Sequence, residues 1–357
     1  MIRYLLHKVG YALLTLWGVV TVIFLLFNML PSDPARMMLD QNESSEQLAI
    51  IKKKYGFDKP LLTQYGYYVN DLSFLSFHST SLDDYTYFSE SKYSGTKLFR
   101  LGNTNVVIKY PYLRTSFQKS GKTVTSIIGN TLPNTIVLAI GAICVAILIG
   151  VVLGIVSAVY KDTWIDKGIQ VVSTLGMSVP SFFSAILFAW IFGYLLHEYT
   201  RLKMTGSLFE MDDFGEGITL QWQNLILPAI VLGIRPLAVV IQLMRNSLLE
   251  VLSLDYIRTA KAKGLGMYKV IVNHAFKNAL NPVVTAISGW FASMLAGAVF
   301  VEYIFGWNGL GKEIVDALNT SDLPVIMGSV LVIAAMFIFI NILVDMVYAW
   351  LDPKVRL

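Results

Sequence analysis

Long stretches without any charged side chain constrain what this chain can fold into more than any other feature. Five of them occur along the 357 residues: 9–30, 132–159, 168–196, 279–301 and 323–344. A helix needs about 20 apolar residues to cross the hydrocarbon core of a bilayer, so each stretch is long enough to be a span. A sixth segment, about 224–249, is apolar except for Arg235 and Arg245. The sequence therefore predicts an all-α integral membrane protein with six transmembrane helices.

Two other interpretations of the apolar segments are weaker. A soluble helical protein is one, but buried soluble helices seldom extend beyond about 20 residues without a charge. Only 15% of this chain is charged, against about 25% in soluble domains. A cleaved secretory signal is the other, but the first apolar segment is too long for one and no small-residue cleavage site follows it. We therefore expect residues 1–30 to be a cytoplasmic N-terminus and a retained first span.

Lysine and arginine in the short connections set the expected orientation, because cytoplasmic loops of membrane proteins are enriched in them. With the N-terminus in the cytoplasm, eleven of these residues lie inside and three outside. The inside set is Arg3, Lys8, Lys161, Lys167, Arg258, Lys261, Lys263, Lys269, Lys277, Lys354 and Arg356; the outside set is Arg201, Lys203 and Lys312. The sequence predicts a multi-pass protein with both termini cytoplasmic and residues 31–131 outside.

The long outside segment, residues 31–131, has a soluble character unlike the rest of the chain. Residues 43–57 have the pattern of a short amphipathic helix that ends at Gly56, and the chain after them is rich in tyrosine and phenylalanine. We expect these rings to build a small packed cap. The remaining residues, 132–351, are the predicted transmembrane core. Its helices are expected at about 132–159, 168–196, 224–249, 279–301 and 323–348, with a cytoplasmic loop at 250–278.

Several residues predict how the spans are shaped and packed. Pro180 falls inside the third span and should kink or break it, with the hydroxyls of Ser178 and Ser181 near the freed backbone groups. Gly150 and Gly154 form a GxxxG motif, which permits close helix approach but alone is weak evidence of an interface. Aromatic residues near span ends are typical of interfacial belts; here they are Trp164, Trp222, Trp307, Tyr348 and Trp350.

The loop between the fourth and fifth spans carries the most informative local pattern. Asp255 is a good helix N-cap residue, and a helix-compatible stretch runs from it to Gly264. Ile257, Ala260 and Gly264 fall on one small apolar face, which suits insertion into a groove on a partner protein. The charged face carries Arg258, Lys261, Lys263 and Lys269. The alternative is a plain basic cytoplasmic loop that follows the charge rule.

This loop closely resembles the ATPase-coupling loop of dipeptide, oligopeptide and nickel permeases among bacterial ABC importers. Its DYIRTAKAKGL and HAFKNALNPVV segments carry the likeness. Arg258, Thr259, Ala260 and Gly264 occupy the four defined positions of the importer signature E-A-A-x3-G. Arginine thus replaces the glutamate and threonine the first alanine, as in the peptide and nickel branch. Further family-like segments follow in the family's order: LPSDPAR (30–36), YGFDKPLLTQY (55–65), LPNTIVLA (132–139), MSVPSFF (177–183), LPAIVLG (227–233) and FGWNGLG (305–311).

The resemblance implies a six-helix permease fold (MetI-like) that forms half of a translocation pore in the bacterial inner membrane. Its implied partners are a second homologous permease subunit, two ABC ATPase subunits, an extracytoplasmic substrate-binding protein and the lipid bilayer, with no nucleic acid. The ATPases would bind ATP, and this chain would be non-catalytic with no cofactor or metal. The ATPase-coupling residues that it assigns are Asp255, Ile257, Arg258, Thr259, Ala260, Lys261, Lys263 and Gly264. Residues 79–110 resemble an insertion into the family's shorter first loop.

Two other functions fit parts of the sequence. Residues 116–123, SFQKSGKT, end like a phosphate-binding loop of an ATP-binding enzyme, but Ser116 stands where that motif needs glycine. The segment is also predicted outside, where there is no ATP. An ion-coupled secondary transporter or a channel is the second alternative. Such transporters usually use intramembrane carboxylates, and the predicted spans hold acids only at their ends, at Glu250, Glu302 and Asp345.

Arg235, Pro180 and Ser178 are the candidate translocation-pathway residues. Arg235 lies near the middle of the fourth span, where an arginine costs at least about 2.5–3.5 kcal/mol on insertion scales. Two explanations of this arginine stand side by side. It contacts the substrate's carboxylate or lines a gate, or its guanidinium is satisfied by backbone carbonyls beside Pro236. The sequence does not distinguish a dipeptide, an oligopeptide, a nickel chelate or a glutathione-like solute as the substrate.

Overall fold

The computed structural model describes residues 2–28, 35, 45–82, 84–211 and 217–351. The chain divides into two compact units. The first comprises Met1–Asn130 and Glu313–Ala335, and the second Thr131–Lys312 and Met336–Leu357. The LPSDPAR segment, apart from Ala35, lies outside the described residues, as do Lys354 and Arg356.

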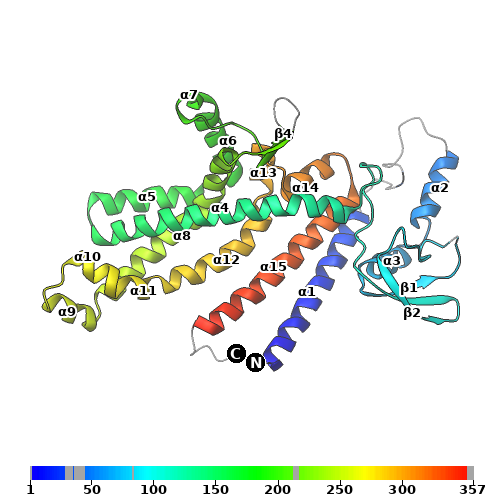
Figure 1. Ribbon diagram of the computed structural model, residues 1–357, viewed down its shortest axis with the longest axis horizontal. Helices are drawn as coiled ribbons and strands as arrows, with labels where there is room; N and C mark the ends of the chain where they lie inside the picture. Colours follow the sequence, from blue (N-terminus) through cyan, green and yellow to red (C-terminus); the bar gives the residue numbers. More distant parts are fainter. Residues whose placement is uncertain (1, 29–34, 36–44, 83, 212–216, 352–357) are drawn as a thin grey trace. The chain divides into compact units, whose positions relative to one another are not determined.

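Long apolar helices make up most of the described chain (Figure 1). Four are long and apolar enough to cross a membrane: α1 (Ile2–Asn28), α4 (Val124–Val159), α8 (Gln223–Leu252) and α15 (Leu323–Leu351). One bent pair is α5 (Trp164–Ser178) with α6 (Ser181–Phe188) and the π-helix η2 (Ala189–Leu195); the other is α12 (Asn281–Gly297) with α13 (Val299–Phe305). Counting each pair as one span raises the number to six. The predicted all-α membrane fold is confirmed, and the predicted six spans correspond to this upper figure.

The remaining elements are short. They are α7 (His197–Thr200), the hairpin of β4 (Phe209–Met211) and β5 (Ile218–Leu220), α9 (Asp255–Ala262), α10 (Met267–Val270), the π-helix η3 (Ile271–Ala275), α11 (Phe276–Ala279) and α14 (Leu310–Asn319). Four of them, α9 to α11 with η3, form the loop that follows α8.

The first unit contains α1, a cap and the start of α15. The cap begins with α2 (Ser45–Tyr55) and α3 (Leu61–Leu72), followed by β1 (Leu75–Ser79), β2 (Gly95–Leu101) and β3 (Thr104–Lys109). The strands form an antiparallel sheet of order β1-β3-β2. The helix predicted to end at Gly56 is α2, and the φ of +72° at Gly56 is a conformation that favours glycine. The sequence indicated packed rings here but no sheet.

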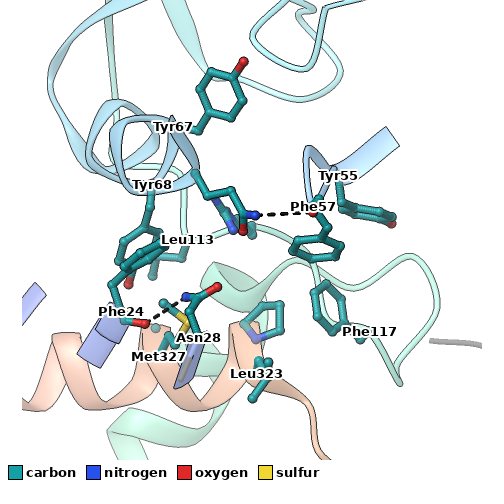
Figure 2. Close-up of a pocket in the computed structure, with 14 residues that line it drawn as sticks. Phe24, Asn28, Tyr55, Phe57, Tyr67, Tyr68, Leu113, Phe117, Leu323 and Met327 are labelled. Atoms are coloured by element: carbon teal, nitrogen blue, oxygen red, sulfur yellow. Dashed lines mark hydrogen bonds between the residues drawn. The ribbon is translucent and has the colours of Figure 1, made fainter. Parts of the chain in front are cut away.

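An apolar cluster joins α1, α3 and α15 within this unit. It consists of Val20, Ile23, Phe24, Tyr68, Met327 and Leu331. The rings of Phe24 and Tyr68 stack with their centroids 5.8 Å apart. Figure 2 shows the adjoining cavity, where Phe57 and Phe117 face Leu113 and Met327. Its volume of about 30 Å³ holds one or two waters, which is too small for a transported solute.

In the second unit, α4 and α8 approach each other very closely. A Cβ atom added at Gly150 would lie 2.7 Å from Val240 Cγ1, and one at Gly154 would lie 2.7 Å from Met244 Cβ. From the other side, a Cβ atom at Gly233 of α8 would lie 2.7 Å from the carbonyl oxygen of Ala142. The GxxxG motif therefore marks a helix contact inside this chain. Further helices contact α8: α5, α6, α9, α11, α12 and α13.

The third predicted span is broken at Pro180, as the sequence predicted. α5 ends at Ser178 and α6 begins at Ser181, with a bend of 109° between the two halves. Proline has no N–H to continue the helical bonding. The Ser178 hydroxyl donates to the carbonyl oxygen of Thr174 at 2.9 Å, and the Ser184 N–H donates to the carbonyl oxygen of Pro180 at 3.1 Å. These bonds satisfy backbone groups on both sides of the break.

The interfacial-belt prediction is wrong for Trp307. Its side chain is fully buried, and its Nε1–H donates to the carbonyl oxygen of Asn134 at 3.0 Å. Glu302 nearby is also fully buried and accepts from the N–H of Gly311 at 2.7 Å. A Cβ atom at Gly309 would lie 2.3 Å from the Glu302 carboxylate, so the FGWNGLG segment forms a tightly packed turn. By contrast, Trp164 and Trp222 are exposed, as a belt requires.

Replacing Gly154 with alanine should destabilise the chain. The added methyl group would meet Met244 and the carbonyl oxygen of Ile241, which lies 2.9 Å away. Overpacking of this kind costs about 1–3 kcal/mol, so the thermal unfolding temperature in detergent should fall. Gly129→Ala is the matched control in the same helix, because open space surrounds Gly129 and alanine is the better helix former. Equal unfolding temperatures for the two variants would contradict the close contact.

Candidate functional site

Residues 253–279 fold into a compact helical loop at the C-terminal end of α8. Its first helix, α9, has Leu254 in the extended N-cap position. Asp255 is therefore the first helical residue, and its prediction as the N-cap is wrong by one position. The Asp255 carboxylate lies 3.2 Å from Arg258 Nη1 instead. Both side chains are largely exposed, so this ion pair contributes little to stability.

The end of α9 is a left-handed turn at Gly264, as the sequence predicted. Gly264 has a φ of +84°. Its N–H donates to the carbonyl oxygen of Lys261 at 2.9 Å, and the N–H of Leu265 donates to that of Ala260 at 3.4 Å. This pair of bonds is the Schellman pattern that closes many helices. Because residues with a Cβ atom resist this conformation, glycine fixes the direction in which the chain leaves α9.

The small apolar face of α9 is covered by the chain itself. Ile257 is 0% exposed and Ala260 is 6% exposed. They belong to one core cluster with Met244 and Leu248 of α8 and Val270 of α10. The expectation that Ile257 and Ala260 enter a groove on a partner is therefore wrong, whereas Gly264, the third residue of the predicted face, is exposed. A periodic pattern identifies the apolar face of a helix, but not the surface that covers it.

The other coupling residues assigned by resemblance are exposed. They are Asp255, Arg258, Thr259, Lys261, Lys263 and Gly264. Beside them, Met267 and Tyr268 of α10 expose 46% and 79% of their surface. We call these eight residues the outer face of the loop. Tyr268, Met267 and Arg258 are of residue types that are enriched at protein interfaces, whereas lysine and aspartate are depleted there.

A buried ion pair fastens α5 to α8 close to the loop. Arg245 Nε lies 2.8 Å from Asp166 Oδ1, and Arg245 Nη2 lies 2.6 Å from Asp166 Oδ2. The same carboxylate accepts from the Ser157 hydroxyl at 2.5 Å and from the N–H of Asp162 at 3.0 Å. The Asp166 side chain is 4% exposed, whereas Arg245 keeps 18% of its side chain exposed. The pair and its hydrogen bonds link the end of α4, the start of α5 and the C-terminal half of α8.

A cavity of about 100 Å³ lies beside the break between α5 and α6. It brings Arg235 of α8 together with Val179 and Ser181, the two neighbours of Pro180. Arg235 is exposed and has no hydrogen bond or ion pair within the described part of the chain. The explanation that backbone carbonyls beside Pro236 satisfy its guanidinium is therefore wrong for this structure. Ser178 does not line the cavity.

In the cap, one buried carboxylate organises a cluster of rings and cations. Asp71 is 1% exposed and accepts from the hydroxyls of Tyr85 at 2.8 Å and Tyr93 at 3.1 Å, and from Arg114 Nε at 3.1 Å. Lys109 Nζ donates to the Asp71 carbonyl oxygen. Two more contacts complete the cluster: Lys92 Nζ lies 3.8 Å from the ring centroid of Tyr85 and donates to the Tyr85 carbonyl oxygen.

The SFQKSGKT segment does not form a phosphate cradle. Its Ser116 hydroxyl and the N–H groups of Phe117 and Gln118 all donate to the carboxylate of Asp322. The position that a phosphate would need is thus taken by a side chain of the same unit. This arrangement argues against the ATP-binding alternative.

Sequence reasoning missed the Asp166–Arg245 pair and the Asp71 cluster. Arg245 was visible as a charge at the end of an apolar segment, which signals a need for a partner. The partner itself, Asp166, lies 79 positions away. For Asp71 the only signal was the abundance of tyrosine around it.

The chain matches two protein-family models. Residues 150–357 match the binding-protein-dependent transport system inner membrane component, and residues 1–86 match the N-terminal region of binding-protein-dependent transport system membrane components. The first match covers more than half of the sequence. The chain belongs to this family of transport permeases, and the resemblance stated from its motifs is confirmed.

Two of the curated relatives align over the whole chain, and a third over part of it. A putative peptide permease protein of Brucella suis biovar 1 is 33% identical over 361 residues, covering 100% of this chain and 99% of the relative. The dipeptide transport system permease protein of Alkalihalophilus pseudofirmus is 32% identical over 369 residues, covering 100% of both. That of Haemophilus influenzae is 42% identical over 213 residues, covering 56% of this chain and 64% of the relative. A multi-pass inner-membrane protein and a component of an ABC importer follow from family and helices together.

The buried cations of the cap predict how its stability depends on pH. Burial lowers the pKa of Lys92 and of Lys109 from 10.5 to about 8. Between about pH 8 and 10.5 the folded cap thus binds fewer protons than the unfolded chain, and its free energy of unfolding rises with pH. Burial also raises the pKa of Tyr68 and of Tyr112 from 10.0 to about 12. The stability that these two neutral tyrosines give the folded cap is fully present below pH 10 and is lost as the pH rises toward 12.

We therefore expect cap stability to rise from pH 7.5 to 9.5 and to fall above pH 10. Hydrogen-exchange protection of the Val106 and Val107 amides, corrected for the intrinsic exchange rate, measures this in the purified chain. Lys92→Met should flatten part of the rise. Protection that falls steadily between pH 8 and 9.5 would contradict the lowered pKa values of Lys92 and Lys109.

Proposed function

We propose that this chain is half of the translocation pore of an ATP-driven importer of peptides. The observation that carries the proposal is the structure of the loop after α8. Its buried residues pack against Met244 and Leu248 of α8, and its basic outer face is exposed. Family membership supports the transport role, and the names of the relatives support peptides as the substrate class. The coupling assignment of Asp255, Arg258, Thr259, Lys261, Lys263 and Gly264 is kept as part of this proposal. Ile257 and Ala260 take the role of anchors in it.

The buried contacts suggest how force on the loop reaches the pore. Ile257 and Ala260 are buried in one cluster with Met244 and Leu248 of α8. In this proposal, a shift of α9 therefore also moves Met244 and Leu248. Arg245, one residue from Met244, passes the displacement to α5 through Asp166. α5 ends at Ser178, two residues before Pro180, where the broken span bends. A dense core transmits small displacements because it is nearly incompressible.

The family resemblance implies the proposed partners. One of two ABC ATPase subunits would bind the outer face and the other the corresponding loop of the second permease; the ATPases would bind all the ATP, so this chain would be non-catalytic. A second homologous permease subunit would complete the pore. An extracytoplasmic binding protein would deliver the peptide to the cap side. Residues 79–110, which carry β2 and β3, are proposed as an insertion for that contact. The gap at 87–149 between the two family matches overlaps residues 87–110 of this segment.

Reversing two charges on the outer face should uncouple the importer without unfolding it. Arg258→Glu with Lys261→Glu changes exposed side chains only, so the thermal unfolding temperature should stay near wild type. Because charge complementarity steers and holds protein partners, we expect about a tenfold or greater loss of ATPase co-purification and of ATP-driven peptide uptake.

Lys167→Gln is the control, since it removes an exposed basic charge of α5 outside the loop and should leave uptake near wild type. Uptake at the wild-type rate in the double variant would show that this loop is not the coupling element. Uptake that persists without any ATPase subunit would favour a channel or an ion-coupled transporter.

The proposed topology places the termini and the loop in the cytoplasm and residues 31–131 outside. It is tested with single cysteines after replacing Cys144, the only cysteine in the sequence, with serine. Glu90 and Lys161 are both exposed and charged, which makes them a matched pair. An impermeant thiol reagent on intact cells with a permeabilised outer membrane should label Glu90→Cys and spare Lys161→Cys. The reverse pattern would overturn the orientation.

A further inference from the structure

The cavity beside Pro180 holds an arginine whose position is unusual for a membrane protein. Arg235 lies about 18 Å along α8 from its start, at 1.5 Å per residue, and α8 is about 45 Å long by the same measure. The residue is therefore well inside the bilayer if α8 spans it. It is exposed and without a partner in the described residues. A charge at this depth on a lipid-facing surface is strongly unfavourable, so Arg235 faces either a water-filled path or a partner helix.

The other polar groups lining the cavity are all neutral. Hydroxyls come from Ser181, Ser184 and Ser293, and an indole N–H comes from Trp290. Ser184 is buried, and no carboxylate is among the lining residues. The cavity therefore presents one full positive charge and several hydrogen-bond donors, with no negative charge to compete for it. Such a set binds an anion.

The break in the third span adds to this positive character. Ser181 is the first residue of α6 and also lines the cavity. The first N–H groups of a helix have no partner within it, and the aligned peptide dipoles place partial positive charge there. The N–H of Ser184 is already bonded to Pro180, which leaves the earlier ones of the first turn for a ligand. Two elements, α6 and α8, thus direct positive charge at the same space.

We propose that this cavity is a transient binding site for the carboxylate end of the peptide in transit. The inference rests on the proposed importer function and specifies its substrate chemistry. Arginine donates two parallel hydrogen bonds to a carboxylate. The serine hydroxyls can donate to the remaining lone pairs of that carboxylate. A volume of about 100 Å³ admits the terminal group but not a whole peptide. The site is open enough for release, as transport requires of any binding step along a pore.

The test uses a cysteine as a reporter inside the cavity. Ser293 is exposed and lines it, so Ser293→Cys in the Cys144→Ser background reports the local potential. The full transporter in membrane vesicles is treated with anionic and cationic methanethiosulfonates of similar size. Arg235 should make the anionic reagent react about fivefold faster than the cationic one, from Coulomb attraction at a few ångströms in a solvated site.

Three substitutions and one pair of peptides test which group of the cavity binds the carboxylate. Arg235→Gln should bring the ratio of the two rates close to one, whereas Arg235→Lys should keep most of it. Lys161→Gln, which removes an exposed lysine between α4 and α5, should leave it unchanged. Trialanine with a free carboxylate should slow modification of Cys at position 293, and trialanine amide should not.

The inference is overturned if neither reagent reaches the cysteine, if Arg235→Gln leaves the ratio unchanged, or if acid and amide protect equally. ATP-driven trialanine uptake in the same vesicles separates this failure from failure of the proposed function. If wild-type uptake is normal but Arg235→Gln leaves the ratio of the anionic to the cationic modification rate unchanged, only the proposed carboxylate site is removed. The expected labelling pattern without any uptake supports the site and removes the importer assignment.

Discussion

The close approach of α4 and α8 is the contact on which the second unit depends. Gly150, Gly154 and Gly233 remove the side chains that would otherwise separate the two backbones. In lipid there is no hydrophobic gain from bringing apolar helices together, so close packing between small residues supplies the attraction. Once α8 is held in this way, the α-helices α5, α6, α9, α11, α12 and α13 and the π-helix η3 contact it. The loop, the cavity and the buried ion pair are all placed by this one helix.

A consequence of this arrangement is that α8 links two functions that occur at different depths. Its C-terminal end packs against the loop through Met244 and Leu248, and its first half carries Arg235. The ion pair between Arg245 and Asp166 ties the same helix to the broken span. The residues that contact the proposed coupling element and the residue proposed to contact the substrate thus lie on one continuous helix, with Pro236 between them.

The sequence predicted the features that depend on local chemistry. Charge-free length located the apolar helices, Pro180 predicted the break, and Gly56 and Gly264 predicted helix ends that need a positive φ. For the candidate site, the position of the loop and its exposed cations were also predictable. In each case the residues that decide the outcome are neighbours in the chain.

The features that the sequence missed depend on contacts between distant residues. The periodicity of α9 identified an apolar face, but the chain's own core covers Ile257 and Ala260. Trp307 lies at a span end, yet it packs inside because Asn134 and the glycines around Glu302 make room for it. The partners of Asp71 come from segments up to 43 positions away. No local pattern encodes which of several tyrosines or arginines meets a given carboxylate.

The bond between Ser116 and Asp322 joins residues 206 positions apart and has a consequence for how the protein is made. Asp322 immediately precedes α15, the last long helix, whereas Ser116 follows the cap. The ribosome must therefore finish nearly the whole polypeptide before the first unit can close, although most of that unit is synthesised early. Until then, Tyr68 of the cap lacks its packing partners Met327 and Leu331 of α15.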